Sequence, residues 1–145
     1  MVKRTDLRIS AREFKQAVDF HGHLGPWLIL GILLGKLAIK KIKAKRHFGI
    51  KVTATGLNEK PRSCLIDGLQ LSTGATFGKG NISKKASGIP AVTFTNIKTG
   101  GKIKFYFNDE LLNKLAALNN HKESERFARV LLKYNVAELF KQRVK

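Results

Sequence analysis

The feature that most constrains this chain is a run of uncharged residues from 24 to 35, read Leu-Gly-Pro-Trp-Leu-Ile-Leu-Gly-Ile-Leu-Leu-Gly. Such a run is too short to span a bilayer and is typical of a helix buried in a protein core. Pro26 suits the first turn of that helix, because its missing N–H has no intrahelical partner there. We therefore expect a buried helix from Pro26 to about Lys43, apolar nearly all round until Lys36.

Gly31 and Gly35 lie four residues apart on one face of this expected helix. Glycine inside a helix costs stability, so its presence usually has a packing or functional reason. We expect this face to approach a sheet or another helix closely.

The remaining elements follow from caps and from alternation of apolar and polar residues. A capping box, Ser10-x-x-Glu13, predicts a helix over residues 11–19. Asn108 is expected to cap a helix that starts at Asp109. Other predicted helices cover residues 64–71, 123–133 and 136–143, and predicted strands cover 50–57, 91–97 and 102–107, the last two joined by a hairpin turn at 98–101. Helices and strands do not alternate strictly, so we expect one α+β domain over residues 1–145, with helices on one face of a mixed sheet.

The charge of the chain is far from neutral. Lys and Arg number 28 against 10 Asp and Glu, which gives a net charge of +18 and suggests an anionic partner. The densest segment, Lys36–Arg62, holds nine basic residues and one acid, Glu59. Lys outnumbers Arg 20 to 8, whereas Arg is the main residue of base readout, and no nucleic-acid-binding motif is present. Binding of nucleic acid or an acidic partner through this segment is therefore an alternative that we do not favour over a solvated surface.

The compartment is inferred from the single cysteine and the N-terminus. Cys64 has no partner in the chain for a disulfide, which favours a reducing compartment. The first residues carry charge with no apolar stretch behind them, so we expect no signal peptide. We expect a cytoplasmic protein without membrane association.

The sharpest local motif is His21-Gly22-His23 in the turn before the buried helix. Two imidazoles and a thiolate suit zinc or another borderline transition metal, and three protein ligands leave an open position. If the strand from residue 50 returns Cys64 to this turn, His21, His23 and Cys64 form such a site. The alternative is coincidence, with Cys64 a small buried apolar residue.

Asp67 and the glycine-rich segment that follows it leave several roles open. Asp67 follows Cys64 by three residues, so it could orient a ligating histidine, act as a general base or be a solvated charge. Residues 72–81 lack the spacing of a Walker A loop. A turn that holds a small anion with Lys79, or a purely structural turn, fits this segment.

At these two motifs the chain resembles the FmdE family, which is named after a component of formylmethanofuran dehydrogenase. The family signature Phe-His-Gly-His-x-Cys-Pro-Gly corresponds to Phe-His-Gly-His-Leu-Gly-Pro-Trp at residues 20–27. A second signature is a Cys, then Asp-Gly-x-Gln, then Thr-Gly-Cys-Thr-x-Gly-Lys-Gly-Asn. It corresponds to Cys64, Asp-Gly-Leu-Gln at 67–70 and Thr-Gly-Ala-Thr-Phe-Gly-Lys-Gly-Asn at 73–81.

This resemblance implies an α+β domain with a helix, strand, helix and three-strand core, a four-stranded mixed sheet and C-terminal helices. A strand over residues 76–84 is implied where local propensity indicates a loop. The resemblance also implies an archaeal-type protein that binds one transition metal, with zinc expected, and forms a homodimer. We expect this chain to be a stand-alone form without the C-terminal Cys-rich zinc-binding domain of longer members.

Two departures from the family pattern remove thiols: Gly25 and Ala75 stand where the family has Cys. Redox chemistry that needs two neighbouring thiols is thereby lost, whereas His21, His23 and Cys64 remain as metal ligands. The resemblance then suggests Asp67 and Lys79 as catalytic residues and Thr73, Thr76 and Lys79 as binding residues for an anionic substrate group. The function expected is a metal-dependent enzyme, or an accessory subunit of a larger oxidoreductase complex, in one-carbon metabolism.

Overall fold

The computed structural model describes residues 8–86 and 88–144 of the 145-residue chain. Residues 1–7, on which the expectation of no signal peptide rests, lie outside the described residues. Five strands form one mixed sheet in the order β2-β1-β3-β4-β5. The strands are β1 (Ile50–Thr55), β2 (Ile82–Lys85), β3 (Ala91–Asn96), β4 (Lys102–Phe107) and β5 (Phe140–Val144). β1 and β2 are parallel, and every other neighbouring pair is antiparallel.

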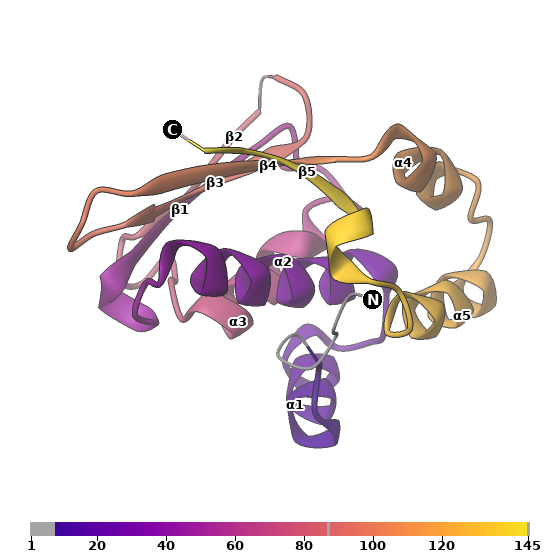
Figure 1. Cartoon of the computed structure of the whole chain (residues 1–145). Helices are drawn as coiled ribbons and strands as arrows, with labels where there is room; N and C mark the ends of the chain where they lie inside the picture. Colours follow the sequence, from indigo (N-terminus) through magenta and orange to yellow (C-terminus); the bar gives the residue numbers. More distant parts are fainter. Residues whose placement is uncertain (1–7, 87, 145) are drawn as a thin grey trace.

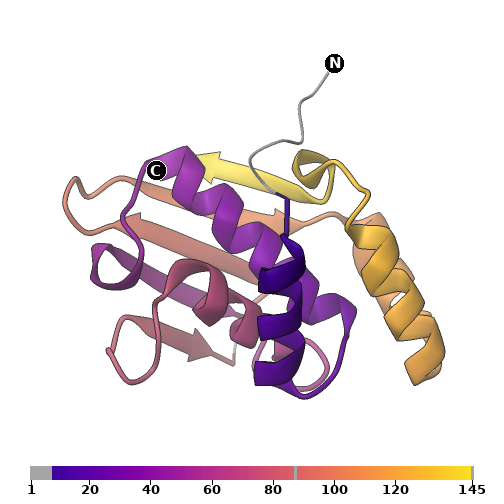
Figure 2. The same cartoon turned by 90° about the horizontal axis from the view of Figure 1, so that it is seen from below.

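The helices lie on one side of this sheet or beyond its end. They are α1 (Ala11–His21), α2 (Pro26–Ile42), α3 (Cys64–Thr73), α4 (Asp109–Ala116) and α5 (His121–Leu131), with 3₁₀ turns at η2 (His47–Gly49) and η3 (Val136–Glu138). Figure 1 shows α2 and α3 beneath the sheet, with α1 on the far side of α2 and no described helix on the opposite sheet face. Figure 2, seen from below, shows α1 crossing in front of α2, and α4 and α5 stacked beyond one end of the sheet.

This architecture confirms the α+β class and the order of the core. The order α2-β1-α3-β2-β3-β4 is the helix, strand, helix and three strands that the family resemblance implies. The strand implied over residues 76–84 is shorter and later than expected, because residues 76–80 form turns and β2 begins at Ile82. Among the described residues, no helix is long and apolar enough to cross a membrane.

The expected helix over residues 136–143 is wrong. Only η3 is helical there, and β5 then adds a fifth strand to the edge of the sheet beside β4. Residues 136–143 contain good helix formers, but their pairing with β4 overrides that preference. Phe140 anchors the strand, since its ring meets those of Phe105 and Phe107 at centroid distances of 6.2 and 5.5 Å.

The role expected for Asn108 is also wrong in detail. The helix does start at Asp109, but the Asn108 side chain makes no capping bond. Its amide donates instead to the Glu138 carbonyl, which ties the start of α4 to η3. By contrast, the capping box of α1 is present, with Ser10 Oγ accepting from Glu13 N at 3.1 Å and Glu13 Oε1 accepting from Ser10 N at 3.0 Å.

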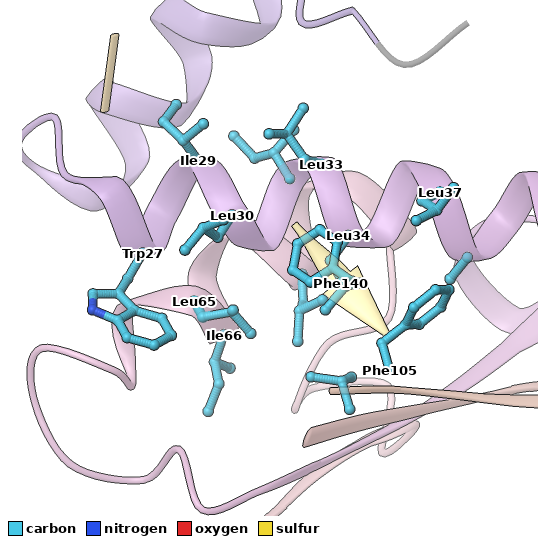
Figure 3. Close-up of a cluster of buried hydrophobic side chains, with 14 of the residues drawn as sticks. Trp27, Ile29, Leu30, Leu33, Leu34, Leu37, Leu65, Ile66, Phe105 and Phe140 are labelled. Carbon is cyan, nitrogen blue, oxygen red and sulfur yellow. The ribbon is translucent and has the colours of Figure 1, made fainter. Parts of the chain in front are cut away.

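Helix α2 is the centre of the hydrophobic core, as the apolar run predicts. Its residues from Pro26 to Gly35 are all buried, and they pack between the sheet, α3 and α5. Figure 3 shows the α2 side chains, with Leu65 and Ile66 from α3 and Phe105 and Phe140 from the sheet, gathered in this layer.

Gly31 confirms the expected close approach, and its neighbour is α3. A Cβ built on Gly31 would lie 2.1 Å from the Leu65 carbonyl oxygen and 2.9 Å from the Gly68 Cα. The backbones of α2 and α3 are therefore in direct contact. Because His21 precedes α2 and α3 carries Cys64, this contact sets the distance between the two halves of the predicted site.

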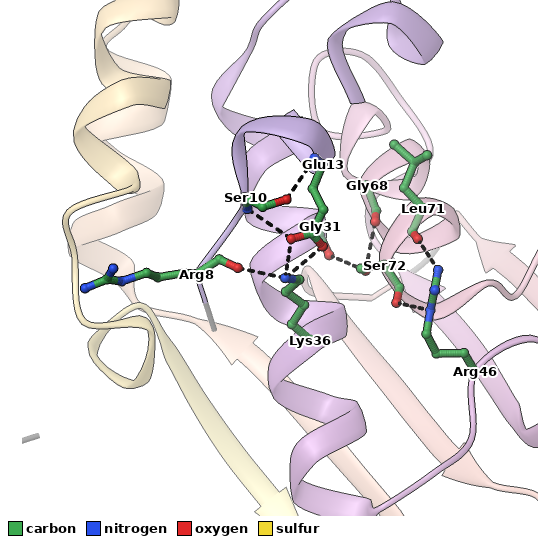
Figure 4. A network of polar contacts seen from close by, with 9 residues as sticks. All are labelled: Arg8, Ser10, Glu13, Gly31, Lys36, Arg46, Gly68, Leu71 and Ser72. Carbon is green, nitrogen blue, oxygen red and sulfur yellow. Dashed lines mark hydrogen bonds and ion pairs between the residues drawn. The ribbon is translucent and has the colours of Figure 1, made fainter. Parts of the chain in front are cut away.

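A polar network fastens α1 and α3 to α2, as Figure 4 shows. Lys36 Nζ donates to Glu13 Oε1 at 2.8 Å and to the Arg8 carbonyl at 2.7 Å. Ser72 Oγ donates to the carbonyls of Gly31 and Gly68, at 3.2 and 2.9 Å. These contacts place α1, which ends at His21, against the helix pair.

Candidate functional site

The site begins with a hydrogen bond between α1 and α3. His21 Nδ1 lies 2.6 Å from Asp67 Oδ2, and the His21 side chain is only 9% exposed. Gly22 has φ of 103° and ends α1 in the left-handed region, which glycine adopts without steric cost. The chain reverses there, so that His23 returns beside His21 with a ring centroid distance of 4.6 Å.

The second ring nitrogen of His21, Nε2, is buried and has no hydrogen-bond partner among the described residues. When Nδ1–H donates to the carboxylate, the neutral form of the ring carries its lone pair on Nε2. A carboxylate behind a histidine is also the arrangement that orients and strengthens metal-ligating imidazoles.

A pocket of about 260 Å³ lies next to this pair of histidines. It combines apolar walls with a few polar groups, as ligand sites commonly do. The residues around it are His23, Gly25, Pro26, Trp27, Lys60, Pro61, Cys64, Leu115, Leu118, His121 and Ser124.

His121 is the site residue that the sequence analysis missed. It is the first residue of α5, and its ring meets that of His23 edge-on at a centroid distance of 6.2 Å. Three of the four histidines in the chain therefore lie close together, and two of them, His23 and His121, line the pocket. Because the chain has only four histidines, each of them could have been considered as a site residue from the sequence. The position of α5 beside His23, however, is not encoded in any local motif.

Cys64 reaches the same pocket from the first turn of α3, where it is half-buried. Burial raises the pKa of the Cys64 thiol, the negative charge of Asp67 raises it further, and Lys60 opposes both. The thiol therefore carries its proton at neutral pH and is a weak nucleophile.

The three predicted ligands share a neighbourhood without forming a coordination shell. Within residues 8–86 and 88–144, no three or more His, Cys, Asp or Glu side chains are grouped so that they could hold a metal ion. His21 and His23 are adjacent, and His23 and Cys64 line one pocket. One donor, His21 Nε2, is buried and oriented, whereas His23 and His121 are exposed side chains.

Comparison with known proteins identifies the family. A sequence model described as "FmdE, Molybdenum formylmethanofuran dehydrogenase operon" matches residues 20–143. The chain belongs to the FmdE family. The match covers both motifs, strands β1 to β4 and β5 up to Arg143.

Two individual proteins illustrate the similarity of this FmdE family member to others. A probable S-adenosyl-L-methionine-binding protein from Archaeoglobus fulgidus is 29% identical over 100 residues, which are 68% of this chain and 27% of that protein. The chain thus corresponds to about a quarter of the length of that relative. A crystal structure of an FmdE-like protein of the tungsten formylmethanofuran dehydrogenase type, from Syntrophus aciditrophicus, superposes with a TM-score of 0.67 at 22% identity, over 100% of this chain and 77% of that one. This superposition supports the fold.

The two positions where this FmdE chain lacks the expected Cys differ in their surroundings. Gly25 lines the pocket, and a Cβ built on it would lie 3.3 Å from His23 Cε1. A side chain at position 25 would therefore touch the His23 ring. Ala75 is fully buried next to the C-terminal end of α3.

The residues predicted to bind an anionic substrate group do not line the histidine pocket. Thr73 is fully buried, and its Oγ1 donates to the Leu69 carbonyl at 2.6 Å and accepts from Ala75 N at 3.1 Å. Thr76 Oγ1 accepts from Lys79 N at 3.1 Å, and Lys79 Nζ lies 5.7 Å from the centre of the Phe48 ring. Their substrate role, and a catalytic role for Lys79, stay predictions.

The basic segment Lys36–Arg62 is divided among several surfaces of the fold. Lys36 pairs with Glu13, and Arg46 donates to the carbonyls of Leu71 and Ser72 at the end of α3. Lys51 lies in β1, and Lys60 borders the histidine pocket. The charge density along the sequence therefore does not become one continuous stripe in the described structure.

Proposed function

We propose that this FmdE family member is a metal-dependent enzyme or accessory subunit of one-carbon or oxidoreductase metabolism, with a single transition metal bound at His21. Zinc is the expected metal, because imidazole and thiol donors suit it. The observation that carries the proposal is the Nε2 atom of His21, which is buried without a hydrogen-bond partner among the described residues, in a ring that Asp67 orients.

The donor set fits such a metal in part. A neutral imidazole nitrogen buried without a partner is costly, and a metal ion would satisfy it. His23, His121 and Cys64 border the adjoining pocket and would supply the remaining ligands. A metal with an open position supplies a Lewis acid that polarises a substrate oxygen or activates water.

The chain's own residues would prepare the site for that chemistry. Asp67 holds the His21 ring in one tautomer and orientation through the 2.6 Å contact. Trp27 and Leu115 form apolar walls that would exclude water from a small substrate, while Lys60 at the rim would attract an anionic group. Because the pKa of Cys64 is raised, a metal must displace the thiol proton before that sulfur can ligate.

The ligand in the name of the Archaeoglobus relative, S-adenosyl-L-methionine, does not suit this pocket. S-adenosyl-L-methionine carries a sulfonium cation, which a carboxylate would stabilise. The residues that line the pocket include Lys60 and histidines but no Asp or Glu among those described. The pocket therefore favours a neutral or anionic small molecule.

The same proposal includes the setting of the protein. We propose a cytoplasmic homodimer that associates with a larger oxidoreductase, in keeping with the operon for which the family is named. Purification from the native source, followed by identification of the proteins that accompany it, would distinguish an accessory subunit from an independent enzyme.

Metal binding is tested with untagged protein by elemental analysis and by competition of zinc with a chromophoric chelator. We expect one metal per chain, and a decrease in zinc affinity of roughly 10- to 100-fold for Asp67→Asn. His21→Asn and Cys64→Ala are expected to lower the zinc affinity at least as much as Asp67→Asn does. His47→Asn is the matched control, because His47 lies against Gly74, away from the pocket, and has a positive φ that Asn tolerates.

A gain-of-function variant separates metal binding from a structural role of these residues. Gly25 has φ of −144°, which any residue adopts, and its Cβ would face the His23 ring. Gly25→Cys is expected to raise zinc affinity at least tenfold. Absence of metal in wild type under every metal offered, or zinc binding that His21→Asn leaves unchanged, would overturn the proposal.

A further inference from the structure

The face of the sheet opposite the helices is a separate feature of the molecule. Figure 1 shows no described helix over it. The five strands contain no Asp or Glu, although they contain seven Lys and Arg residues. The acids of the described residues all lie in helices, 3₁₀ turns and loops.

The pairing register places six of the seven strand cations on this open face. In β1 the buried residues alternate with Lys51, Thr53 and Thr55, whose side chains therefore lie on the open face. The residues that pair with these three, and the residues paired with those in turn, lie on the same face in every other strand. The six cations are Lys51, Lys85, Lys102, Lys104, Lys141 and Arg143.

Tyr106 is the aromatic residue of this open face. It is half-buried, pairs with Ala91 on β3 and Lys141 on β5, and exposes part of its ring. Lys104 Nζ lies 5.2 Å and Arg143 Cζ 5.9 Å from the ring centre. Thr53, Thr93 and Thr95 supply hydroxyl groups across the centre of the same face.

We propose that this open face binds single-stranded nucleic acid. Single strands are bound without sequence preference by cations that follow the backbone and by aromatic rings on which bases stack. The open face offers both, with cations on β1, β2, β4 and β5 and with Tyr106 beside two of them. It is the open face of a sheet, whereas duplex DNA is read by helices or ribbons that enter a groove.

The charges on the face disfavour two other occupants. A second copy docked symmetrically would oppose six cations to six cations, which is repulsive. A membrane surface would attract the lysines, but interfacial binding also needs large apolar side chains, and among the described strand residues this face presents only Tyr106. Polyanion binding here does not depend on metal at the histidine pocket, which lies on the helix side.

The test is titration of the full chain with fluorescein-labelled oligothymidylate, and with oligouridylate of the same length, by fluorescence anisotropy over a range of KCl concentrations. Two triple variants each lower the net charge from +18 to +15. The open-face variant carries Lys104→Gln, Lys141→Gln and Arg143→Gln. The control carries Lys45→Gln, Lys122→Gln and Arg126→Gln, which lie outside the sheet.

We expect wild type to bind at low salt, with affinity that falls steeply as KCl rises. The open-face variant should bind at least tenfold more weakly. Its slope of log affinity against log KCl concentration should be smaller in magnitude by about 2, because each lost contact with a phosphate of a single strand reduces that slope by about 0.7. The control should stay within about twofold of wild type, since distant charges are screened. Tyr106→Thr should weaken binding by about 5- to 100-fold, while Tyr106→Phe keeps the stacking ring and the affinity.

Comparison of the two oligonucleotides distinguishes RNA from DNA as the source of the ligand, and binding of either supports the proposal. The proposal is overturned if neither binds at low salt, or if both triple variants lose affinity equally, which would indicate net charge alone. Binding to phosphatidylserine vesicles without oligonucleotide binding would also overturn it. Circular dichroism of every variant establishes that the fold is retained.

Discussion

Replacement of Gly31 by Ala tests whether backbone contact between α2 and α3 holds the site together. The new Cβ would lie 2.1 Å from the Leu65 carbonyl oxygen, whereas ordinary contact begins at 3.4 Å. The two helices would have to separate by about 1.3 Å, the difference between these distances. Overpacking of this kind costs about 3 kcal/mol, of which the better helix propensity of Ala returns about 1 kcal/mol.

We therefore expect Gly31→Ala to lower the free energy of unfolding by about 2 kcal/mol, since the clash is with backbone that cannot rotate away. In urea this corresponds to a midpoint lower by about 1 M. Separation of α2 from α3 would also lengthen the 2.6 Å contact between His21 and Asp67, which the imidazole ¹⁵N shifts of His21 report.

Gly78→Ala is the matched control for this variant. Its Cβ would meet only Thr76 Oγ1 at 3.7 Å, an ordinary contact, and we expect a change within about 0.5 kcal/mol. If Gly31→Ala were about 1 kcal/mol more stable than wild type, the gain in helix propensity would be unopposed, and the inferred contact between the two backbones would be refuted.

Three further predictions concern the thiol, the α1 network and the edge strand. Burial and the nearby carboxylate raise the pKa of Cys64, so iodoacetamide should alkylate it more slowly than free cysteine at neutral pH, and Asp67→Asn should speed the reaction; an equal rate in both proteins would contradict this. Burial raises the pKa of Glu13, but hydrogen bonds and charge from Lys36 outweigh burial and lower the pKa below 4.5. The ionised Glu13 carboxylate therefore stabilises the fold above pH 4.5, and this contribution is lost as the pH falls through the pKa of the folded state. Glu13→Gln, which can keep the capping box, should lower the free energy of unfolding by about 0.5 kcal/mol in urea melts at neutral pH and leave it unchanged in strong acid. A difference in stability that does not depend on pH would exclude the charge of Glu13 as its cause. Phe140→Ala should lower the free energy of unfolding by about 3 kcal/mol and expose the β5 amides to hydrogen exchange, and unchanged protection there would argue against its role as the anchor of β5.

The parts of the fold that could be predicted are those determined by local sequence. The apolar run with Pro26 at its start predicted α2 almost to the residue, and the Ser10 and Glu13 capping box predicted the start of α1. Gly31 predicted a close neighbour, although its identity as α3 depends on tertiary structure.

The parts that could not be predicted depend on long-range pairing. Residues 136–143 favour a helix locally, but the free edge of β4 and the buried Phe140 make a strand there. His121 lies 100 positions from His21 in sequence, and only the docking of α5 brings it to His23. The basic residues of Lys36–Arg62 likewise lie on separate surfaces because of long-range pairing, since the pairing of β1 places Lys51 on the open face.

The central claim is that His21 Nε2 anchors a metal ion at the histidine pocket. Crystals grown with zinc and measured on both sides of the zinc absorption edge test it most directly. We predict one anomalous difference peak within bonding distance of His21 Nε2, about 2.0–2.1 Å, with His23, His121 or Cys64 as further ligands. A fully loaded crystal with its zinc elsewhere, or with water or another side chain bonded to that nitrogen, would contradict it.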